Sequence, residues 1–322
     1  MSRITKDINL VLKSLKLGDI AAIPTETVYG LAADAFSETA IKKVFSTKNR
    51  PIDHPLIMHI APEWDLTQWV SQIPDYAYYL MEYFWPGPLT LILPIKPGAI
   101  SPLITGGQNS VAIRAPNHTM TKELLLQFGK PLVAPSANPY GKISPTTAEH
   151  VKHSFPNSDF LILDGGRCSI GLESTIVSAL EPLKYEIARS GLIDEVQIEN
   201  ITSLKSFAGT NNLKAPGKLL THYQPEKLLY YFDNNEKLSN YLLPGKTLPY
   251  VLTFSKNYQG PYLSIYEFPN KSEDAAYEFY YRLRIADQSE ADNILIELPP
   301  NGTSWFTIRE KIIKAGRPIG LN

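Results

Sequence analysis

The residues best suited to chemistry lie in one loop, APSANPYGKISPTTA at residues 134–148, which directly follows a short apolar run at 131–133. The loop is crowded with hydroxyl, amide and ammonium groups, and its prolines stiffen the backbone that carries them. In α/β proteins, ligands are commonly bound by polar loops at the ends of buried strands. We interpret this loop as a binding loop. An ordinary solvated turn is the alternative.

The same arrangement recurs along the first part of the chain, where further apolar runs are each joined to compact polar segments. These segments are PTETVYG at 24–30, KNRP at 48–51, PGPLTL at 86–91, SVAIRAP at 110–116, GLESTIV at 171–177 and IARSG at 187–191. Repetition favours a shared site over a set of unrelated turns. The cations in or beside these segments are Lys48, Arg50, Arg114, Lys142 and Arg189.

Familiar catalytic motifs are missing from the sequence. It contains no G-x-x-x-x-G-K-[ST], G-x-G-x-x-G, H-E-x-x-H, C-x-x-C or G-x-S-x-G. Cations and hydroxyls without an evident covalent nucleophile suit a reaction driven by positioning and charge neutralisation, such as phosphoryl or nucleotidyl transfer. In that interpretation Lys48, Arg50 and Arg189 neutralise phosphate oxygens, while Ser136, Asn138 and Ser144 donate hydrogen bonds to phosphate or ribose. For any one of these residues, a surface salt bridge or a turn is the alternative.

Neither the histidines nor the cysteine predict a metal site or a nucleophile. His150 and His153 stand beside Glu149, a spacing that a short exposed helix explains without a metal ion. Cys168 is the single cysteine, so it has no internal disulfide partner, and we assign it no role.

Length and composition bound the class of protein. The chain has 322 residues, of which 43% are apolar, so it is long enough for two domains with substantial cores. No apolar run is long enough to cross a bilayer, and the N-terminal segment alternates charged and apolar residues unlike a signal sequence, so we expect a cytoplasmic protein. The formal net charge of −1 disfavours nucleic-acid binding by a whole-surface positive field, but it permits a local basic cleft.

Hydrophobic periodicity predicts a mixed α/β domain over 1–199, a linker over 200–227 that either tethers or closes over the site, and a smaller Rossmann-like α/β domain over 228–322. The expected strands are 19–23, 56–60, 89–94, 110–114, 131–134, 159–164, 174–180, 184–189, 228–232, 249–254, 262–268 and 293–298. The expected helices are an N-terminal one that includes Ile4 and ends near Gly18, then 37–46, 74–84, 120–128, 146–153, 272–287 and 304–315.

Seven segments in order, from residue 24 to residue 225, resemble the L-threonylcarbamoyladenylate synthase family, whose catalytic domain is YrdC-like, in its long two-domain form. They are PTETVYGLA, KNRPIDHPLIMHI, WPGPLTLIL, SVAIRAP, APSANPYGKISPTTA, GLESTIV and APGKLLTHYQP. The resemblance implies a twisted mixed sheet with flanking helices and a large positive cavity.

The resemblance also implies a reaction. L-Threonine, bicarbonate and ATP, the last with Mg²⁺, give threonylcarbamoyl-AMP and pyrophosphate. A separate threonylcarbamoyl transferase complex then uses the product to form N6-threonylcarbamoyladenosine in tRNA.

Family roles are carried over by position. The residues that resemble the L-threonine site are Thr27, His59, Arg114, Ser174 and Thr175. The residues that resemble the ATP site are Lys48, Arg50, His54, Ser110, Ser136, Asn138, Ser144, Arg189 and Tyr223, with Lys48 and Arg50 as the catalytic pair and Tyr223 as the linker residue that closes over the nucleotide. No metal ligand is carried over. His54 and His59 could equally be ordinary turn and strand histidines.

This sequence departs from the family pattern at Asn49, where glycine is common, at Ser190, where proline is common, and at Gln224, where alanine is common. These departures put the rigidity of the loops in question. The alternative function is a module that binds double-stranded RNA or tRNA weakly and turns over no ATP. A carbamoyl-adenylate enzyme with a different acceptor would need acylphosphatase-like or zinc-finger segments, which the sequence lacks.

Overall fold

The chain forms two compact units in the computed structural model, which describes residues 2–207, 214–215, 223–233, 248–256, 258 and 260–319. The first unit comprises Met1–Tyr140, Pro145–Ser169 and Glu173–Lys218. The second comprises Gly141–Ser144, Ile170–Leu172 and Leu219–Asn322. Most of the expected linker, including 208–213 and 216–222, lies outside the described residues.

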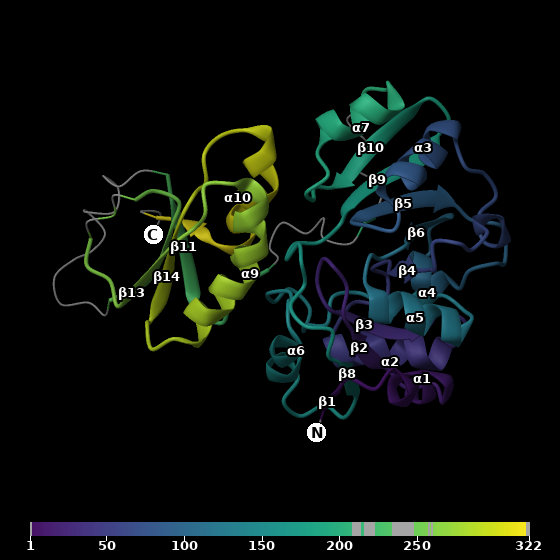
Figure 1. The fold of residues 1–322 in the computed structure, drawn as a ribbon, viewed down its shortest axis with the longest axis horizontal. Coiled ribbons are helices and arrows are strands. Elements are labelled where there is room, and N and C mark those ends of the chain that lie inside the picture. Colours follow the sequence, from purple (N-terminus) through teal and green to yellow (C-terminus); the bar gives the residue numbers. More distant parts are fainter. Residues whose placement is uncertain are drawn as a thin grey trace. The chain divides into compact units, whose positions relative to one another are not determined.

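A mixed ten-stranded sheet runs through the first unit in the order β1-β8-β2-β3-β7-β4-β6-β5-β9-β10 (Figure 1). Its strands are β1 (Arg3–Thr5), β2 (Ala21–Ile23), β3 (Gly30–Asp34), β4 (Ile57–His59), β5 (Leu89–Pro94), β6 (Ser110–Arg114), β7 (Leu132–Val133), β8 (Leu161–Leu163), β9 (Thr175–Glu181) and β10 (Lys184–Arg189). The expected α/β class with a mixed sheet is confirmed.

The two faces of the central strands differ in chemistry because side chains alternate along a strand. One face contributes Met58, Leu91, Ile113 and Val177, among others, to the main hydrophobic core. The neighbouring positions Ile57, Ile92, Ala112 and Ile176 form a separate small apolar cluster, joined by Ala188 and Ala215. We call this cluster the apolar floor.

Helices flank the sheet of the first unit. They are α1 (Ile8–Lys16), α2 (Glu38–Lys48), α3 (Asp75–Phe84), α4 (Pro102–Thr105), α5 (Thr119–Phe128), α6 (Ala148–Ser154) and α7 (Glu195–Thr202), with the 3₁₀ turn η1 at Leu66–Gln68. The prediction of a helix that includes Ile4 was wrong at its start. Ile4 pairs with Ile162 in β1, and the Asp7 side chain caps α1 by accepting from the backbone N–H groups of Asn9 and Leu10.

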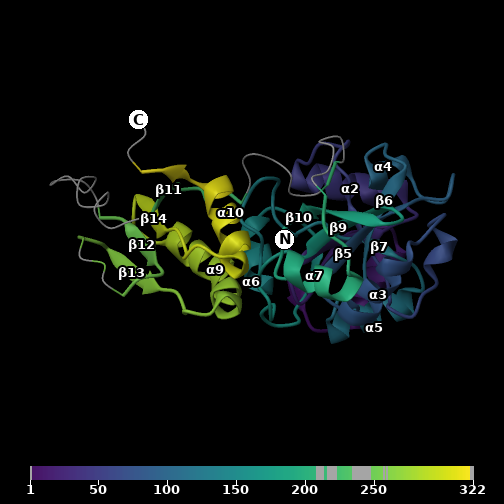
Figure 2. The same ribbon diagram turned by 90° about the horizontal axis from the view of Figure 1, so that it is seen from above.

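The second unit contains a smaller sheet of five strands in the order β13-β12-β14-β11-β15, and every pair in it is parallel. Its strands are β11 (Leu228–Phe232), β12 (Tyr250–Thr253), β13 (Ser264–Glu267), β14 (Asn293–Glu297) and β15 (Arg317–Pro318). Its described helices are α9 (Ser272–Gln288) and α10 (Phe306–Ala315). The 3₁₀ turn η2 (Thr303–Trp305) directly precedes α10. Figure 2 and Figure 1 both show α9 and α10 on the same side of this sheet. The expected small α/β layer is confirmed.

Part of the polar loop belongs to this second unit. Arg284 on α9 is buried and donates to the carbonyl oxygens of Ile143 and Ser144, and burial lowers the pKa of its guanidinium to about 10. Lys142 pairs with Glu226 at 2.8 Å, and the backbone N–H of Gln224 donates to the carbonyl of Gly141. Residues far away in the sequence therefore hold this end of the loop in place.

Asn49 explains one departure from the family pattern. It caps the C-terminus of α2 in the left-handed conformation, with a φ of 52°, and its N–H donates to the last turn of the helix. Glycine suits this conformation best, and asparagine is among the few other residues that tolerate it.

We expect Asn49→Gly to leave the stability of the first unit unchanged or slightly raised, because glycine adopts this φ without strain. Asn49→Val should lower its free energy of unfolding by about 1–2 kcal/mol, because a β-branched side chain clashes in the left-handed region. Urea unfolding followed by tryptophan fluorescence measures both variants. Equal stability of the two would contradict this assignment.

Candidate active site

Two neighbouring strands bring His59 and Arg114 together. β4 and β6 run parallel with His59 opposite Arg114 in register, and each residue is the last of its strand. Both side chains are almost fully buried, at 2% and 4% exposure. The strand ends thus place a buried guanidinium and a buried imidazole at neighbouring positions of the sheet.

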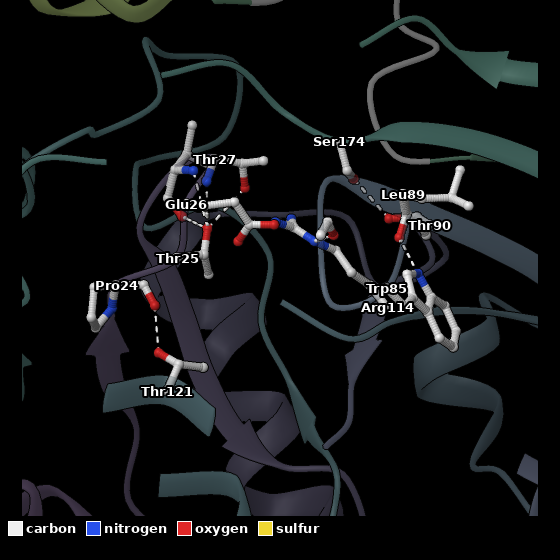
Figure 3. A network of polar contacts seen from close by, with 12 residues as sticks. Pro24, Thr25, Glu26, Thr27, Trp85, Leu89, Thr90, Arg114, Thr121 and Ser174 are labelled. Carbon is white, nitrogen blue, oxygen red and sulfur yellow. Dashed lines mark hydrogen bonds and ion pairs between the residues drawn. The ribbon is translucent and has the colours of Figure 1, made fainter. Parts of the chain in front are cut away.

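Arg114 is held from two sides. Its Nε donates to the carbonyl oxygen of Gly87 at 3.2 Å, and its Nη2 lies 2.7 Å from Oε1 of Glu26 (Figure 3). The Glu26 contact is an ion pair, and neither carboxylate oxygen of Glu26 makes a hydrogen bond among the described residues. Glu26 lies in the PTETVYG segment, but no sequence signal predicted a role for it.

The turn that carries Glu26 and Thr27 between β2 and β3 is organised by Thr25. The Thr25 hydroxyl donates to the carbonyl of Val28 at 2.6 Å and accepts from the backbone N–H of Thr27 at 3.1 Å. The hydroxyls of Thr25 and Thr27 lie 2.8 Å apart. Thr121 adds a further bond to the carbonyl of Pro24, so the turn is fixed from both ends (Figure 3).

Ser174 links the residues expected around threonine to those expected around ATP. Its hydroxyl lies 2.7 Å from that of Thr90, and Arg189 donates to both its carbonyl and its hydroxyl, each at 2.9 Å. Thr175 instead donates its hydroxyl to the carbonyl of Ile193 at 2.8 Å. Gly191 packs closely against Thr175, so a Cβ added at Gly191 would lie only 2.3 Å from the backbone nitrogen of Thr175.

His59 is uncharged at neutral pH. Burial, and then the charge of Arg114, lower the pKa of its imidazole to about 3. Its Nδ1 lies 3.2 Å from the carbonyl oxygen of Ile57, which only accepts, so Nδ1 carries the proton and Nε2 presents a lone pair.

Lys48 ties α2 to the polar loop. Its ammonium donates to the carbonyl oxygens of Ser136 and Asn138, and its own carbonyl accepts from the N–H of Tyr140 at 2.8 Å. The side chain is 2% exposed, and burial, followed by the charge of Arg50, holds its pKa well below the ordinary value. Lys48 therefore shapes the loop as well as adding positive charge to it.

Arg50, His54 and Tyr140 form a second polar group. Arg50 donates to the carbonyl of Pro55 at 2.8 Å, and its guanidinium carbon lies 5.6 Å from the centre of the Tyr140 ring. Nδ1 of His54 lies 2.8 Å from the Tyr140 hydroxyl. Burial, and then the charge of Arg50, lower the pKa of His54.

The cations of the first unit influence each other. Burial lowers the pKa of Arg50 to about 10, and the charge of Arg189 contributes to the decrease just as Arg50 contributes to that of Lys48. Three like charges within electrostatic reach repel each other. A polyanion bound among them would relieve that repulsion, which is why shifted pKa values of this kind mark binding sites.

Ser110 lies at the opposite end of β6 from Arg114. The two side chains share a face of the sheet and are about 13 Å apart, from the rise of a strand. Between them is Ala112 of the apolar floor. An extended ligand could therefore contact polar groups at both ends and apolar groups in the middle.

A described piece of the expected linker, Lys214 and Ala215, packs over this face. Ala215 joins the apolar floor, while Lys214 pairs with Asp53 at 2.8 Å and exchanges backbone hydrogen bonds with the Gln108 side chain. Whether the linker tethers the two units or closes over the site stays open, because 208–213 and 216–222 lie outside the described residues.

Ser144 and Tyr223 belong to the second unit. Ser144 is fully buried, and its carbonyl accepts from Arg284. Tyr223 is 2% exposed, with a φ of 66°, its ring 5.7 Å from that of Tyr280 and 4.3 Å from the Lys311 ammonium. Their assignment to the ATP site stays a prediction, as do the roles of the other carried-over residues.

The described residues contain no group of three or more His, Cys, Asp or Glu side chains that could hold a metal ion. His150 lies 3.3 Å from the hydroxyl of Thr146, a local contact at the start of α6. Among the described helices, none has the length and apolar character needed to span a membrane.

The His59 pKa gives a test of the buried strand end. Below pH 6.5 the unfolded chain protonates this histidine, whereas the folded chain does not. The free energy of unfolding is therefore at its full value above pH 6.5 and falls toward pH 3 by about 1.4 kcal/mol per pH unit. His59→Gln takes up no such proton. Its free energy of unfolding, relative to that of the wild type, should therefore rise by about 2 kcal/mol when the pH is lowered from 7.5 to 5. Urea unfolding at both pH values measures the difference. Parallel pH curves would contradict the burial of a neutral His59.

Comparison with known proteins identifies the family of this chain. The family model described as Telomere recombination matches residues 13–191, and the one described as Threonylcarbamoyl-AMP synthase, C-terminal domain, matches residues 193–316. Threonylcarbamoyl-AMP synthase of Bacillus subtilis (strain 168) is 37% identical over 95% of this chain and 92% of its own length, and that of Pyrococcus abyssi (strain GE5 / Orsay) is 35% identical over 88% and 86%. The crystal structure of P. abyssi Sua5 complexed with L-threonine covers 100% of both chains with a TM-score of 0.88 at 31% identity. The chain belongs to the threonylcarbamoyl-AMP synthase family, in its two-domain form.

Proposed function

We propose that this protein is a nucleotidyltransferase that converts L-threonine, bicarbonate and ATP into threonylcarbamoyl-AMP and pyrophosphate. One observation carries the proposal: a buried guanidinium, Arg114, shares the first unit with the coupled cations Lys48, Arg50 and Arg189. An amino acid carboxylate and a triphosphate are the two anions that such an arrangement suits. The relatives that match over most of the chain bear this activity in their names.

Arg114 would bind the threonine carboxylate, since its fork of N–H groups matches carboxylate geometry. The hydroxyls of Thr27 and Ser174, together with Nε2 of His59, would contact the remaining polar groups of threonine. The buried apolar floor beside them would keep water from the reacting atoms, which strengthens every charge interaction at the site.

In the chemical step, the threonine amine and bicarbonate form a carbamate and water. A carbamate oxygen then attacks the α-phosphorus of ATP, and pyrophosphate leaves. Charge that develops on the phosphate oxygens would be neutralised by Arg50, Arg189 and Lys48, with donors from the loop at Ser136 and Asn138.

Magnesium that accompanies ATP neutralises phosphate charge. We further propose that the product passes to a tRNA-modifying threonylcarbamoyl transferase complex, and that the protein works in the cytoplasm.

The alternative, an RNA-binding module without turnover, fits the site less well. Lys48 and Arg114 are 2% and 4% exposed, so they cannot follow phosphates along an RNA surface. Salt-sensitive binding of tRNA in the absence of any ATP-dependent reaction would support that alternative over the enzyme.

The proposal predicts pyrophosphate release that requires both threonine and bicarbonate. Arg114→Lys keeps the buried charge but loses the fork, so it should raise the KM for threonine by about tenfold or more and leave the KM for ATP nearly unchanged. Arg50→Lys should show the opposite pattern. A coupled pyrophosphate assay measures both.

Arg3→Lys is the matched control, because Arg3 is exposed on the edge strand β1, and it should behave like the wild type. Pyrophosphate release without threonine would refute the proposed function. Equal effects of the two arginine variants on both substrates would refute the separate roles of Arg114 and Arg50.

A further inference from the structure

Glu26 is a buried carboxylate whose hydrogen-bonding capacity is unused. It is 4% exposed, and neither of its oxygens has a hydrogen-bond partner among the described residues. Its ion-pair contact is with Nη2 of Arg114, at 2.7 Å. Buried carboxylates are costly unless hydrogen-bond donors surround them, so this one is suited to a ligand that brings donors with it.

The position of Glu26 is fixed before any ligand arrives. The bonds of Thr25 to Val28 and Thr27 set the turn on which Glu26 stands, and Nε of Arg114 is anchored on the carbonyl of Gly87. Figure 3 shows the carboxylate of Glu26 pointing at the guanidinium of Arg114. The charge of Glu26 also acts on the thiol of Cys168. Burial raises the pKa of this thiol to about 12, so Cys168 is uncharged.

This ion pair has the charge pattern of an α-amino acid in reverse. An amino acid zwitterion carries an ammonium and a carboxylate on one carbon, and the pair offers a carboxylate and a guanidinium side by side. Arg114 therefore accounts for one end of the substrate, and Glu26 is placed for the other. The ammonium would supply the donors that the Glu26 oxygens lack.

We propose that Glu26 binds the α-ammonium group of the amino acid and accepts one proton from it; this rests on the proposed function. The proton moves from nitrogen to a Glu26 oxygen, which leaves a neutral amine with a lone pair. That amine forms the N–C bond to bicarbonate, and the displaced hydroxide leaves as water with the second amine proton. The Glu26 proton passes to solvent after turnover, so the carboxylate is restored.

The test is a thermodynamic cycle in which the Glu26 side chain and the ammonium group of the ligand are replaced, each alone and both together. Calorimetry compares L-threonine with 2,3-dihydroxybutanoate of the same configuration, which has a hydroxyl in place of the ammonium, on the wild type and on Glu26→Gln. The wild type should prefer threonine by roughly 10- to 100-fold, the range for a hydrogen bond to a charged group. Glu26→Gln should lose most of that preference, and its kcat at saturating threonine should fall as well.

Each other outcome decides against a part of the argument. If Glu26→Gln binds threonine more tightly, Glu26 only occupies the place of the substrate carboxylate. If the preference is unchanged, Glu26 only supports Arg114. If the wild type binds no threonine at all, the proposed function itself fails, which separates that failure from a failure of the Glu26 assignment.

Two further variants guard against misfolding. Glu63→Gln removes an exposed carboxylate paired with Lys122 and should leave the preference unchanged. If Glu26→Gln no longer binds ATP, its fold is lost, and Glu26→Asp replaces it, since the shorter side chain keeps the buried charge. Glu26→Asp must then weaken threonine binding more than binding of the hydroxy analogue, and equal weakening would overturn the proposal.

Discussion

The structure of the first unit depends on one constraint, the cost of placing the cations Lys48, Arg50, Arg114 and Arg189 in buried or half-buried positions. Main-chain carbonyl oxygens meet much of this cost, because each cation of the group donates to at least one of them. The pairs are Lys48 with Ser136 and Asn138, Arg50 with Pro55, Arg114 with Gly87, and Arg189 with Ser174. A carbonyl dipole satisfies a buried donor without cancelling its charge. The group thus stays fixed in place, and burial, followed by repulsion from a neighbouring cation, lowers the pKa values of Lys48 and Arg50.

The same bonds explain how separate loops become one site. Arg50 donates to Pro55, only five residues away, whereas Lys48, Arg114 and Arg189 each donate to a carbonyl in a more distant part of the chain and so link two segments. Lys48 connects the end of α2 to the loop after β7, and Arg189 connects β10 to the segment before β9. Removing one of these side chains alters loop position as well as charge, so alanine variants report on both. Arginine-to-lysine changes, which preserve the charge, are the better probes of geometry.

Sequence predicted the elements whose signal is local and missed those set by distant partners. The strands 89–94 and 110–114 appear as β5 and β6 with those bounds, because β-branched runs with clear flanking turns identify them. β3, with the sequence GLAAD, has little β-propensity of its own and forms between β2 and β7. Ile4 was assigned to a helix because its spacing is helical, whereas pairing with β8 places it in a strand. No local pattern pointed to Glu26, because its ion pair with Arg114 joins residues that are far apart in the sequence.

Two of the three departures from the family pattern are Asn49 and Gln224. Both residues contribute to the structure through main-chain atoms. Asn49 supplies a left-handed φ at the end of α2, and Gln224 supplies a backbone N–H to the carbonyl of Gly141. Side-chain identity matters little for such contributions, provided that the backbone conformation is accessible. Both residues keep main-chain hydrogen bonds at these positions, and the effect of the departures on loop rigidity stays a prediction. Lys48 and Arg114, in contrast, contribute through their side chains, which donate hydrogen bonds to main-chain carbonyls of Ser136, Asn138 and Gly87.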